Sequence, residues 1–234
     1  DTFLEIVLKA HAWDDFHIDA VKYRQELMSI EPFQVDAAVR LFYKLYAGRF
    51  GKKLWGDKTP GYVLRMEEIQ KLLPEARFIN IIRDGRDVAA SRQGMSFGPD
   101  DIIAEANDWR NKVASARRQA KKLSYYHEVF YESLVAEPEN QLRQICEFIE
   151  LPYSGLMLEY HKTAAERIGE FGDRTNPDGS VKVCREQRIS IHENTTAAPN
   201  LSKVGRWRKD LSPQDIEKYH EIAADLLIEL GYEV

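Results

Sequence analysis

The sequence of 234 residues predicts an α/β fold in which a mainly parallel central sheet is flanked by helices. Two short apolar runs, at 77–83 and 127–131, have the length and the β-branched and aromatic content of buried strands. Longer segments with apolar residues three and four positions apart lie before, between and after these runs, as amphipathic helices require. Strands that alternate with helices usually pair in parallel, so this order favours an α/β domain.

The individual elements follow from periodicity and from the residues that begin or end helices. The segment 34–50 is predicted to be a helix that ends at Gly51, and 60–73 a second helix with Thr59 as N-cap and Pro60 as first residue. The first strand has the nearly continuous apolar run of a strand covered on both faces. Further helices are predicted over 84–95, 102–123, 139–150 and 212–231, the last capped by a serine.

The stretch from Gly169 to Asn200 differs from the rest of the chain. It is polar, rich in glycine and proline, and shows neither helical nor strand periodicity. Long segments of this kind inside compact domains are usually lids or binding loops. We therefore predict one domain over residues 1–234 with a long, polar, lid-like loop at 169–200.

Composition and charge exclude several classes of protein. The chain has 44% hydrophobic and 30% charged residues, too apolar for a disordered chain, and its apolar runs are too short for a membrane span. The net charge of −5 argues against general nucleic-acid binding. The two cysteines, Cys146 and Cys184, fit a reducing compartment, which predicts a cytoplasmic protein. No spacing of histidines and cysteines matches a metal site, so no metal is expected.

The junction between the first strand and the next helix is the strongest candidate site. Arg83 ends the strand and Ser91 follows eight residues later, about two helical turns. Ligands of open α/β sheets bind outside the carboxyl ends of the strands, so the arginine and the serine are placed to bind one anion, beside the N-terminus of the helix. An exposed cluster of ion pairs that caps the helix explains the same spacing equally well.

Three further segments carry weaker signals when each is taken alone. Lys58, in Asp-Lys-Thr-Pro, lies between the short segment 52–55 and the start of the 60–73 helix, a position that suits a phosphate or sulfate. An N-cap threonine beside an ordinary surface lysine explains this segment better. Tyr131 ends the second strand and begins the sequence Tyr-Glu-x-Leu, with a proline four residues after the leucine. Arg206 lies in Gly-Arg-Trp within a cationic stretch, 201–209.

In order and spacing, these segments together resemble the sulfotransferases that use 3′-phosphoadenosine 5′-phosphosulfate. The resemblance runs from about residue 34 to residue 232, and the branch is that of tyrosylprotein sulfotransferases and many bacterial carbohydrate or natural-product sulfotransferases. It implies a three-layer, P-loop-type α/β fold and transfer of a sulfuryl group to a hydroxyl or amine, with 3′,5′-diphosphoadenosine as product. The acceptor would be a small molecule, a carbohydrate or a peptide.

The resemblance also implies roles for particular residues. Arg83 and Ser91 would bind the 3′-phosphate, Tyr131 would lie by the nucleotide, and Lys58 would act on the sulfuryl group during transfer. Arg206 would belong to the C-terminal nucleotide clamp, where relatives often carry Ser-Lys-Trp. Ser190 is the nearest candidate for a serine upstream of that clamp.

The chain departs from the family pattern in two places. The Gly/Ser/Thr-rich phosphosulfate loop after the first strand of the family is absent from this sequence, so we expect that strand and loop to precede residue 1. Proline follows Lys58-Thr59 where cytosolic relatives have the histidine that serves as base. The candidate bases are Asp1, Glu5, His11 or a residue before position 1. A catalytically silent domain that binds 3′-phosphoadenosine, and a nucleotide kinase, remain alternative functions.

Overall fold

The computed structural model describes residues 2–10, 13–93, 101–176, 178–198 and 200–234. Contacts within the chain divide it into two compact units. The first unit contains residues 1–59 and 159–198, and the second contains residues 60–158 and 199–234. The chain therefore alternates between the two units, and each is described separately.

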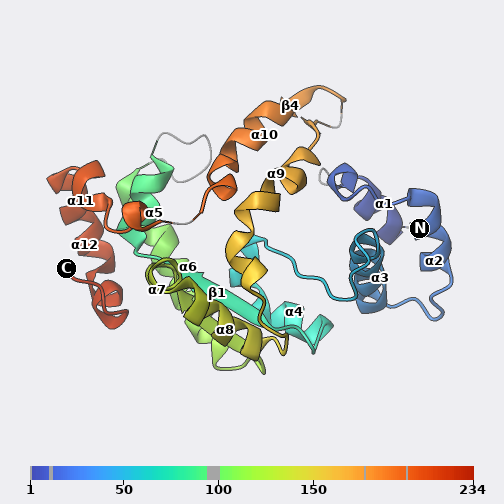
Figure 1. Ribbon diagram of the computed structural model, residues 1–234, viewed down its shortest axis with the longest axis horizontal. Helices are drawn as coiled ribbons and strands as arrows, with labels where there is room; N and C mark the ends of the chain where they lie inside the picture. Colours follow the sequence, from blue (N-terminus) through green and yellow to red (C-terminus); the bar gives the residue numbers. More distant parts are fainter. Residues whose placement is uncertain (1, 11–12, 94–100, 177, 199) are drawn as a thin grey trace. The chain divides into compact units, whose positions relative to one another are not determined.

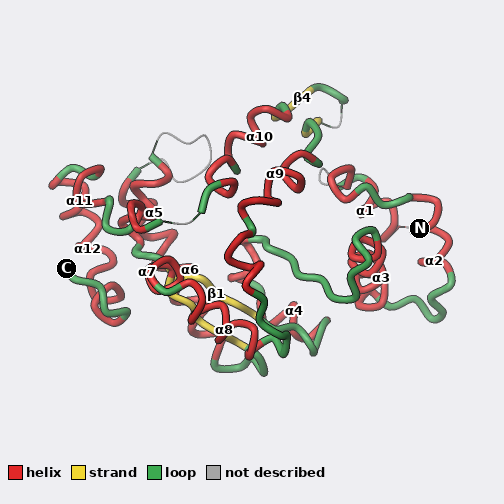
Figure 2. The backbone as a smooth tube through the Cα atoms, viewed as in Figure 1, coloured by secondary structure: helices red, strands yellow, loops and turns green. Residues whose placement is uncertain are grey.

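The second unit is an α/β structure built around a parallel pair of strands (Figures 1 and 2). The strands are β1 (Phe78–Ile82) and β2 (Tyr126–Phe130), paired in register from Phe78 opposite Tyr126 to Ile82 opposite Phe130. The helices, with η for 3₁₀, are η2 (Pro60–Leu64), α4 (Met66–Leu72), α5 (Gly85–Arg92), α6 (Ile102–Ala120), α7 (Tyr131–Ala136), α8 (Pro138–Phe148), η5 (Leu201–Lys203), α11 (Trp207–Asp210) and α12 (Pro213–Glu229). Helix η3 (Gly155–Glu159) crosses the boundary between the units.

The main core of the second unit lies on one face of this sheet. Ile82 packs there against α5, α6 and α12, where Trp109, Tyr219 and Leu227 are buried. Side chains alternate between the two faces along a strand, so Ile79 and Ile81 share the opposite face. These two keep 39% and 55% of their surface exposed. The prediction that the first strand is covered on both faces is therefore wrong, because an apolar run does not show that a second layer lies over it.

The predicted helix over residues 60–73 is interrupted. It consists of η2 and α4, which Arg65 separates. In a continuous helix the Glu67 N–H would donate to the Val63 carbonyl. Instead the buried Gln119 amide lies between these two groups, donating to the Val63 oxygen at 2.9 Å and accepting from the Glu67 nitrogen at 3.1 Å. A side chain from α6 thus forms the hydrogen bonds that these two backbone groups would otherwise lack. Local periodicity cannot reveal a break that depends on a residue so distant in the sequence.

The other predicted elements of the second unit agree with the structure to within a few residues. Asp84 caps α5, Ser212 caps α12 through a hydrogen bond from the Asp215 amide, and Tyr131 begins α7 rather than ending β2. Residues 94–95, at the predicted end of the 84–95 helix, lie outside the described residues.

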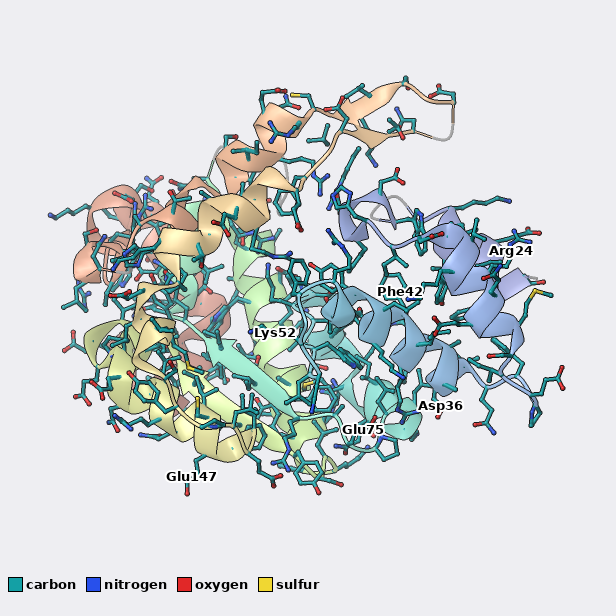
Figure 3. The ribbon with its side chains drawn as sticks, turned by 45° about the vertical axis from the view of Figure 1, so that its right-hand side comes forward. Arg24, Asp36, Phe42, Lys52, Glu75 and Glu147 are labelled. Atoms are coloured by element: carbon teal, nitrogen blue, oxygen red, sulfur yellow. The ribbon has the colours of Figure 1, made fainter. Side chains whose placement is uncertain are left out.

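The first unit is mainly helical and has an aromatic core. Phe42 of α3 (Val35–Gly48) packs edge-to-face against Phe16 and Tyr23, and its position on the helix is shown in Figure 3. The elements are α1 (Thr2–Leu8), η1 (Trp13–Phe16), α2 (Ala20–Met28), α3 (Val35–Gly48), α9 (His161–Gly169), β3 (Arg174–Thr175), β4 (Val181–Val183), α10 (Arg185–Ile191) and η4 (Glu193–Thr196). Helix α3 is the predicted 34–50 helix.

The segment 169–200 has more regular structure than the lid-like loop that the sequence predicts. It contains the antiparallel pair β3 and β4, followed by α10 and η4. Arg185 at the start of α10 donates to the carbonyl oxygens of Gly169 and Phe171, at 3.1 and 3.0 Å. Buried Arg188 forms two hydrogen bonds with the Asp15 carboxylate, at 2.8 and 2.6 Å. Charged contacts of this kind order a polar segment without producing apolar periodicity.

No helix in the described residues has both the length and the apolar character that crossing a membrane requires.

Candidate functional site

The site begins where β1 ends and α5 starts. Asp84 is the N-cap of α5, and its carboxylate accepts the Arg86 amide at 2.9 Å. The Asp84 amide itself donates to Glu132 of α7 at 2.9 Å, and the second oxygen of Glu132 accepts the Tyr232 hydroxyl at 3.1 Å. Carboxylates of the protein therefore already accept two backbone amides at this helix start, which leaves fewer N–H groups there for a ligand.

Gly85 allows this turn to lie directly against the core. A Cβ at this position would lie 2.0 Å from the Tyr219 hydroxyl and 2.4 Å from the Trp109 ring, which is closer than non-bonded heavy atoms approach one another. The Trp109 indole N–H also donates to the Arg83 carbonyl at 3.0 Å. The backbone on both sides of residue 84 is thus fixed by two buried aromatic residues.

Three different contacts orient the Arg83 side chain, which is only 19% exposed. The guanidinium lies over the Tyr131 ring at 4.7 Å, a cation–π distance. Its Nη2 donates to the Lys203 carbonyl at 2.5 Å and lies 3.6 Å from the Asp87 carboxylate. The Nε atom is buried and has no hydrogen-bond partner among the described residues. A buried N–H donor without a partner is costly, so this atom is suited to an acceptor that comes from outside the chain.

Asp87 ties this arginine to a segment more than a hundred residues away. Its side chain is fully buried and accepts the amides of Gly205 and Trp207, at 2.8 and 3.0 Å. Gly205 has a φ of +70°, a conformation that glycine adopts without strain. The loop 203–207 therefore contacts Arg83 directly through Lys203 and indirectly through Asp87.

Arg86 also contacts the 203–207 loop, through the Trp207 ring. Its guanidinium makes two bonds to Asp84, at 3.0 and 2.8 Å, and lies 3.9 Å from the centre of the Trp207 ring. Its Nη1 lies 3.0 Å from Nε2 of His220, which accepts only when the imidazole is neutral. Burial first, and then the Arg86 charge, lower the pKa of His220 below its usual value.

Four of the residues singled out from the sequence lie in this unit. Arg83 and Tyr131 are in contact. Ser91 is four residues after Asp87, which places both on one face of α5, and its hydroxyl forms no hydrogen bond with another described residue. Arg206 lies in the loop that Asp87 holds, with its own side chain bonded to Asp210 at 2.5 Å.

The other two candidates, Lys58 and Ser190, belong to the first unit. Lys58 is exposed on the segment that follows α3. Ser190 lies on α10, where its hydroxyl donates to the Gln187 carbonyl at 2.9 Å. Thr59 does not cap a helix and instead donates to Asp57 at 3.2 Å.

Among the candidate bases, Asp1 and His11 lie outside the described residues. Glu5 is exposed on α1, where its carboxylate lies 3.6 Å from Lys9. His192 is a further candidate that the sequence did not indicate; it caps α10 at its C-terminus and lies beside Phe171, with 5.2 Å between the ring centres. Burial first, and then the charges of Lys58, Arg188 and Arg174, lower the pKa of this histidine. No motif marked His192, because its neighbours come together only in the fold.

The sequence assigned no role in the site to Asp87 or Trp109, and it indicated Glu132 only as a member of the Tyr-Glu-x-Leu motif. The repeated Arg-Asp of residues 83–87 signalled Asp87, but its partners in the 203–207 loop could be seen only in the structure. In the described part of the chain, no three or more His, Cys, Asp or Glu side chains gather as a metal ion would require.

A family model described as "Sulfotransferase family" matches residues 3–155. This match covers more than half of the chain and includes the junction between β1 and α5.

The chain belongs to the sulfotransferase family.

Individual relatives agree with this result. The chain is 25% identical over 234 residues to nodulation protein NoeE of Sinorhizobium fredii, covering 90% of this chain and 51% of NoeE. It is 25% identical over 184 residues to protein-tyrosine sulfotransferase A of Caenorhabditis elegans, covering 76% of this chain and 44% of that protein. This sulfotransferase-family chain thus spans about half the length of these curated relatives.

A solved structure supports the fold. The sulfotransferase domain from the curacin biosynthetic pathway aligns with a TM-score of 0.55 and 16% identity, covering 96% of this chain and 78% of that domain. The α/β sulfotransferase fold that the sequence predicts is therefore confirmed.

Proposed function

We propose that residues 1–234 act as one sulfotransferase domain that transfers a sulfuryl group from 3′-phosphoadenosine 5′-phosphosulfate to a hydroxyl or amine. Membership of the family supports sulfuryl transfer. The choice of donor rests on the residues at the end of β1 and on the motifs around them.

The Arg83 guanidinium is the observation that carries this proposal. It is mostly buried, lies against an aromatic ring, and keeps its Nε donor unpaired. Arginine binds phosphate through several N–H groups at once, and an unpaired donor of this kind fits a phosphate oxygen. Ser91, on the face of α5 that carries Asp87, adds a hydroxyl. These residues suit a 3′-phosphate, which distinguishes the donor from common adenine nucleotides.

The roles that we propose for the remaining residues come from the resemblance of their motifs to those of the family. When bound, the donor supplies an activated sulfuryl group. Tyr131 lines the nucleotide site beside Arg83, and Arg206 contributes charge from the 203–207 loop. The resemblance also gives Ser190 a role in nucleotide binding. Lys58 stabilises the negative charge that develops on the oxygens around sulfur. Transfers with loose transition states depend mainly on positioning and charge stabilisation of this kind.

A group that accepts the proton of the acceptor completes the reaction. The sequence offers Glu5, Asp1 and His11 as candidates for this group, and the structure adds His192. Its lowered pKa leaves the imidazole neutral at pH 7, and the Lys58 charge acts on it. A neutral imidazole is able to take up a proton, whereas a protonated one is not.

The acceptor is proposed to be a small molecule, a carbohydrate or a peptide. The relatives named above include a protein-tyrosine sulfotransferase and a nodulation protein, so acceptors within the family differ. The free cysteines Cys146 and Cys184 suit a reducing compartment, and we propose a cytoplasmic location on that ground.

Replacing Arg83 with alanine tests the donor assignment. We expect the variant to bind 3′,5′-diphosphoadenosine about 10- to 100-fold more weakly, the usual effect of losing a hydrogen-bonded charge, and to bind ADP as before. Isothermal titration calorimetry measures both affinities. Arg143→Ala is the matched control, because Arg143 also contacts a carboxylate and a tyrosine ring but lies on α8.

Two outcomes would contradict the proposal. Equal affinity of the wild-type protein for 3′,5′-diphosphoadenosine and ADP, or tighter binding of ATP, would favour a general nucleotide site such as that of a kinase. Selective binding without transfer of radiolabelled sulfuryl groups to any acceptor in a cell extract would favour a silent binding domain.

A further inference from the structure

The Asp87 carboxylate is the most deeply buried anionic side chain near the site and joins its own helix to two other segments. It lies on α5, at 3.6 Å from Arg83 at the end of β1, and accepts two amides of the 203–207 loop. Its side chain is 1% exposed. The sequence motifs assign functions to Arg83 and Arg206 but none to this residue.

A buried carboxylate is stable only while its partners remain in place. Two amide hydrogen bonds at 2.8 and 3.0 Å, together with the Arg83 charge, replace the water that Asp87 loses. If the loop or the arginine moved away, a buried charge would lose part of this compensation. The position of the loop and the position of the guanidinium are therefore energetically coupled through one side chain.

The geometry leaves Arg83 available for a ligand. The separation of 3.6 Å is an ion-pair distance beyond that of a close hydrogen bond, and it involves Nη2, which also donates to Lys203. The Nε edge of the guanidinium is not used by the protein. Asp87 thus orients Arg83 without occupying the donor that a phosphate requires.

We propose that Asp87 is a positioning residue that gives the nucleotide site its selectivity for a 3′-phosphate. It holds Arg83 and the 203–207 loop in one arrangement before the nucleotide arrives. Less conformational freedom is then lost on binding, and the gain is confined to nucleotides that engage Arg83. This inference rests on the proposed function, because it takes the anion at Arg83 to be the 3′-phosphate.

The substitution Asp87→Asn tests this role, since it keeps the shape of the side chain and removes its charge, together with one of the two oxygens that accept loop amides. We define selectivity as the affinity for 3′,5′-diphosphoadenosine divided by the affinity for ADP. We expect that ratio to fall about tenfold in the variant, the lower end of the couplings found for close charge pairs, because the separation of 3.6 Å exceeds that of a close hydrogen bond. A purely structural role would weaken both nucleotides equally and leave the ratio unchanged.

A double-mutant cycle tests whether Asp87 acts through Arg83. When Arg83→Ala is already present, adding Asp87→Asn should leave the selectivity ratio unchanged, because the residue through which Asp87 acts is gone. Glu128→Gln is the matched control, because Glu128 pairs with Arg117 at 2.5 Å in the same unit but away from the site. It should alter stability alone.

Hydrogen exchange of the wild-type protein provides a measurement that needs no variant, in case Asp87→Asn fails to fold. The Gly205 and Trp207 amides, which Asp87 accepts, should be protected more by 3′,5′-diphosphoadenosine than by ADP at equal saturation. Equal protection, or a folded Asp87→Asn variant with wild-type selectivity, overturns the positioning role alone. A wild-type protein without selectivity overturns the proposed function, and this inference with it.

Discussion

The substitution Gly85→Ala tests whether the junction between β1 and α5 is held by close packing. The new methyl group would lie 2.0 Å from the Tyr219 hydroxyl and 2.4 Å from the Trp109 ring. Both rings are buried, so neither has room to move. Overpacking of this kind costs about 1–3 kcal/mol, and the higher helix propensity of alanine offsets up to about 1 kcal/mol.

Because the overlap involves two rings, we expect a net loss of about 2 kcal/mol in the free energy of unfolding. At about 2–4 °C per kcal/mol for a chain of this size, the melting temperature should fall by about 4–8 °C. Urea denaturation and thermal melting measure the two quantities. Displacing Trp109 also disturbs its hydrogen bond to the Arg83 carbonyl, so affinity for 3′,5′-diphosphoadenosine should fall as well.

Gly61→Ala is the control for this experiment. Gly61 belongs to the same unit, and a Cβ there meets no atom within 4 Å. Its stability should stay within about 0.5 kcal/mol of wild type. A Gly85→Ala variant as stable as the Gly61→Ala variant would show that the junction relaxes freely, and the argument for a rigid site would fail.

Two further predictions concern charge. His220 has a lowered pKa in the folded protein, so the unfolded chain takes up its proton more readily, and the free energy of unfolding should decline as the pH falls below about 6.5. His220→Gln should reduce that decline in urea titrations at pH 7.5 and 5.5; an identical decline would refute the assignment. Lys58→Ala should lower turnover about 10²- to 10³-fold with little change in donor affinity, and should raise the pKa of His192 measured by NMR. Lys53→Ala, an exposed lysine of the same segment, is the control, and equal losses of turnover and affinity would contradict the role of Lys58.

Local sequence patterns predicted most elements of the second unit, because those elements depend on nearby residues. Ser212 caps α12, and β1 follows directly from its apolar run. The break at Arg65 could not be predicted in this way, since it is satisfied by Gln119 from another helix. The exposure of Ile81 has a similar origin, because an apolar run records composition and says nothing of what covers it.

In the candidate site, too, the sequence indicated the features that depend on nearby residues and not those that depend on distant ones. The spacing of Arg83 and Ser91 marked the end of a strand as a place for an anion. The residues that orient them act over long sequence distances. Trp109 holds the Arg83 carbonyl, and Asp87 accepts amides from residues 205 and 207. Such contacts leave no periodicity or local motif, so they become visible only when the chain is folded.

A crystal structure of the protein with 3′,5′-diphosphoadenosine tests the central claim most directly. The 3′-phosphate should accept hydrogen bonds from the Arg83 guanidinium, including its Nε, and from the Ser91 hydroxyl, with Tyr131 beside the nucleotide. A nucleotide bound elsewhere, or one whose 3′-phosphate points to solvent while Arg83 contacts only Asp87 and Lys203, would contradict the account.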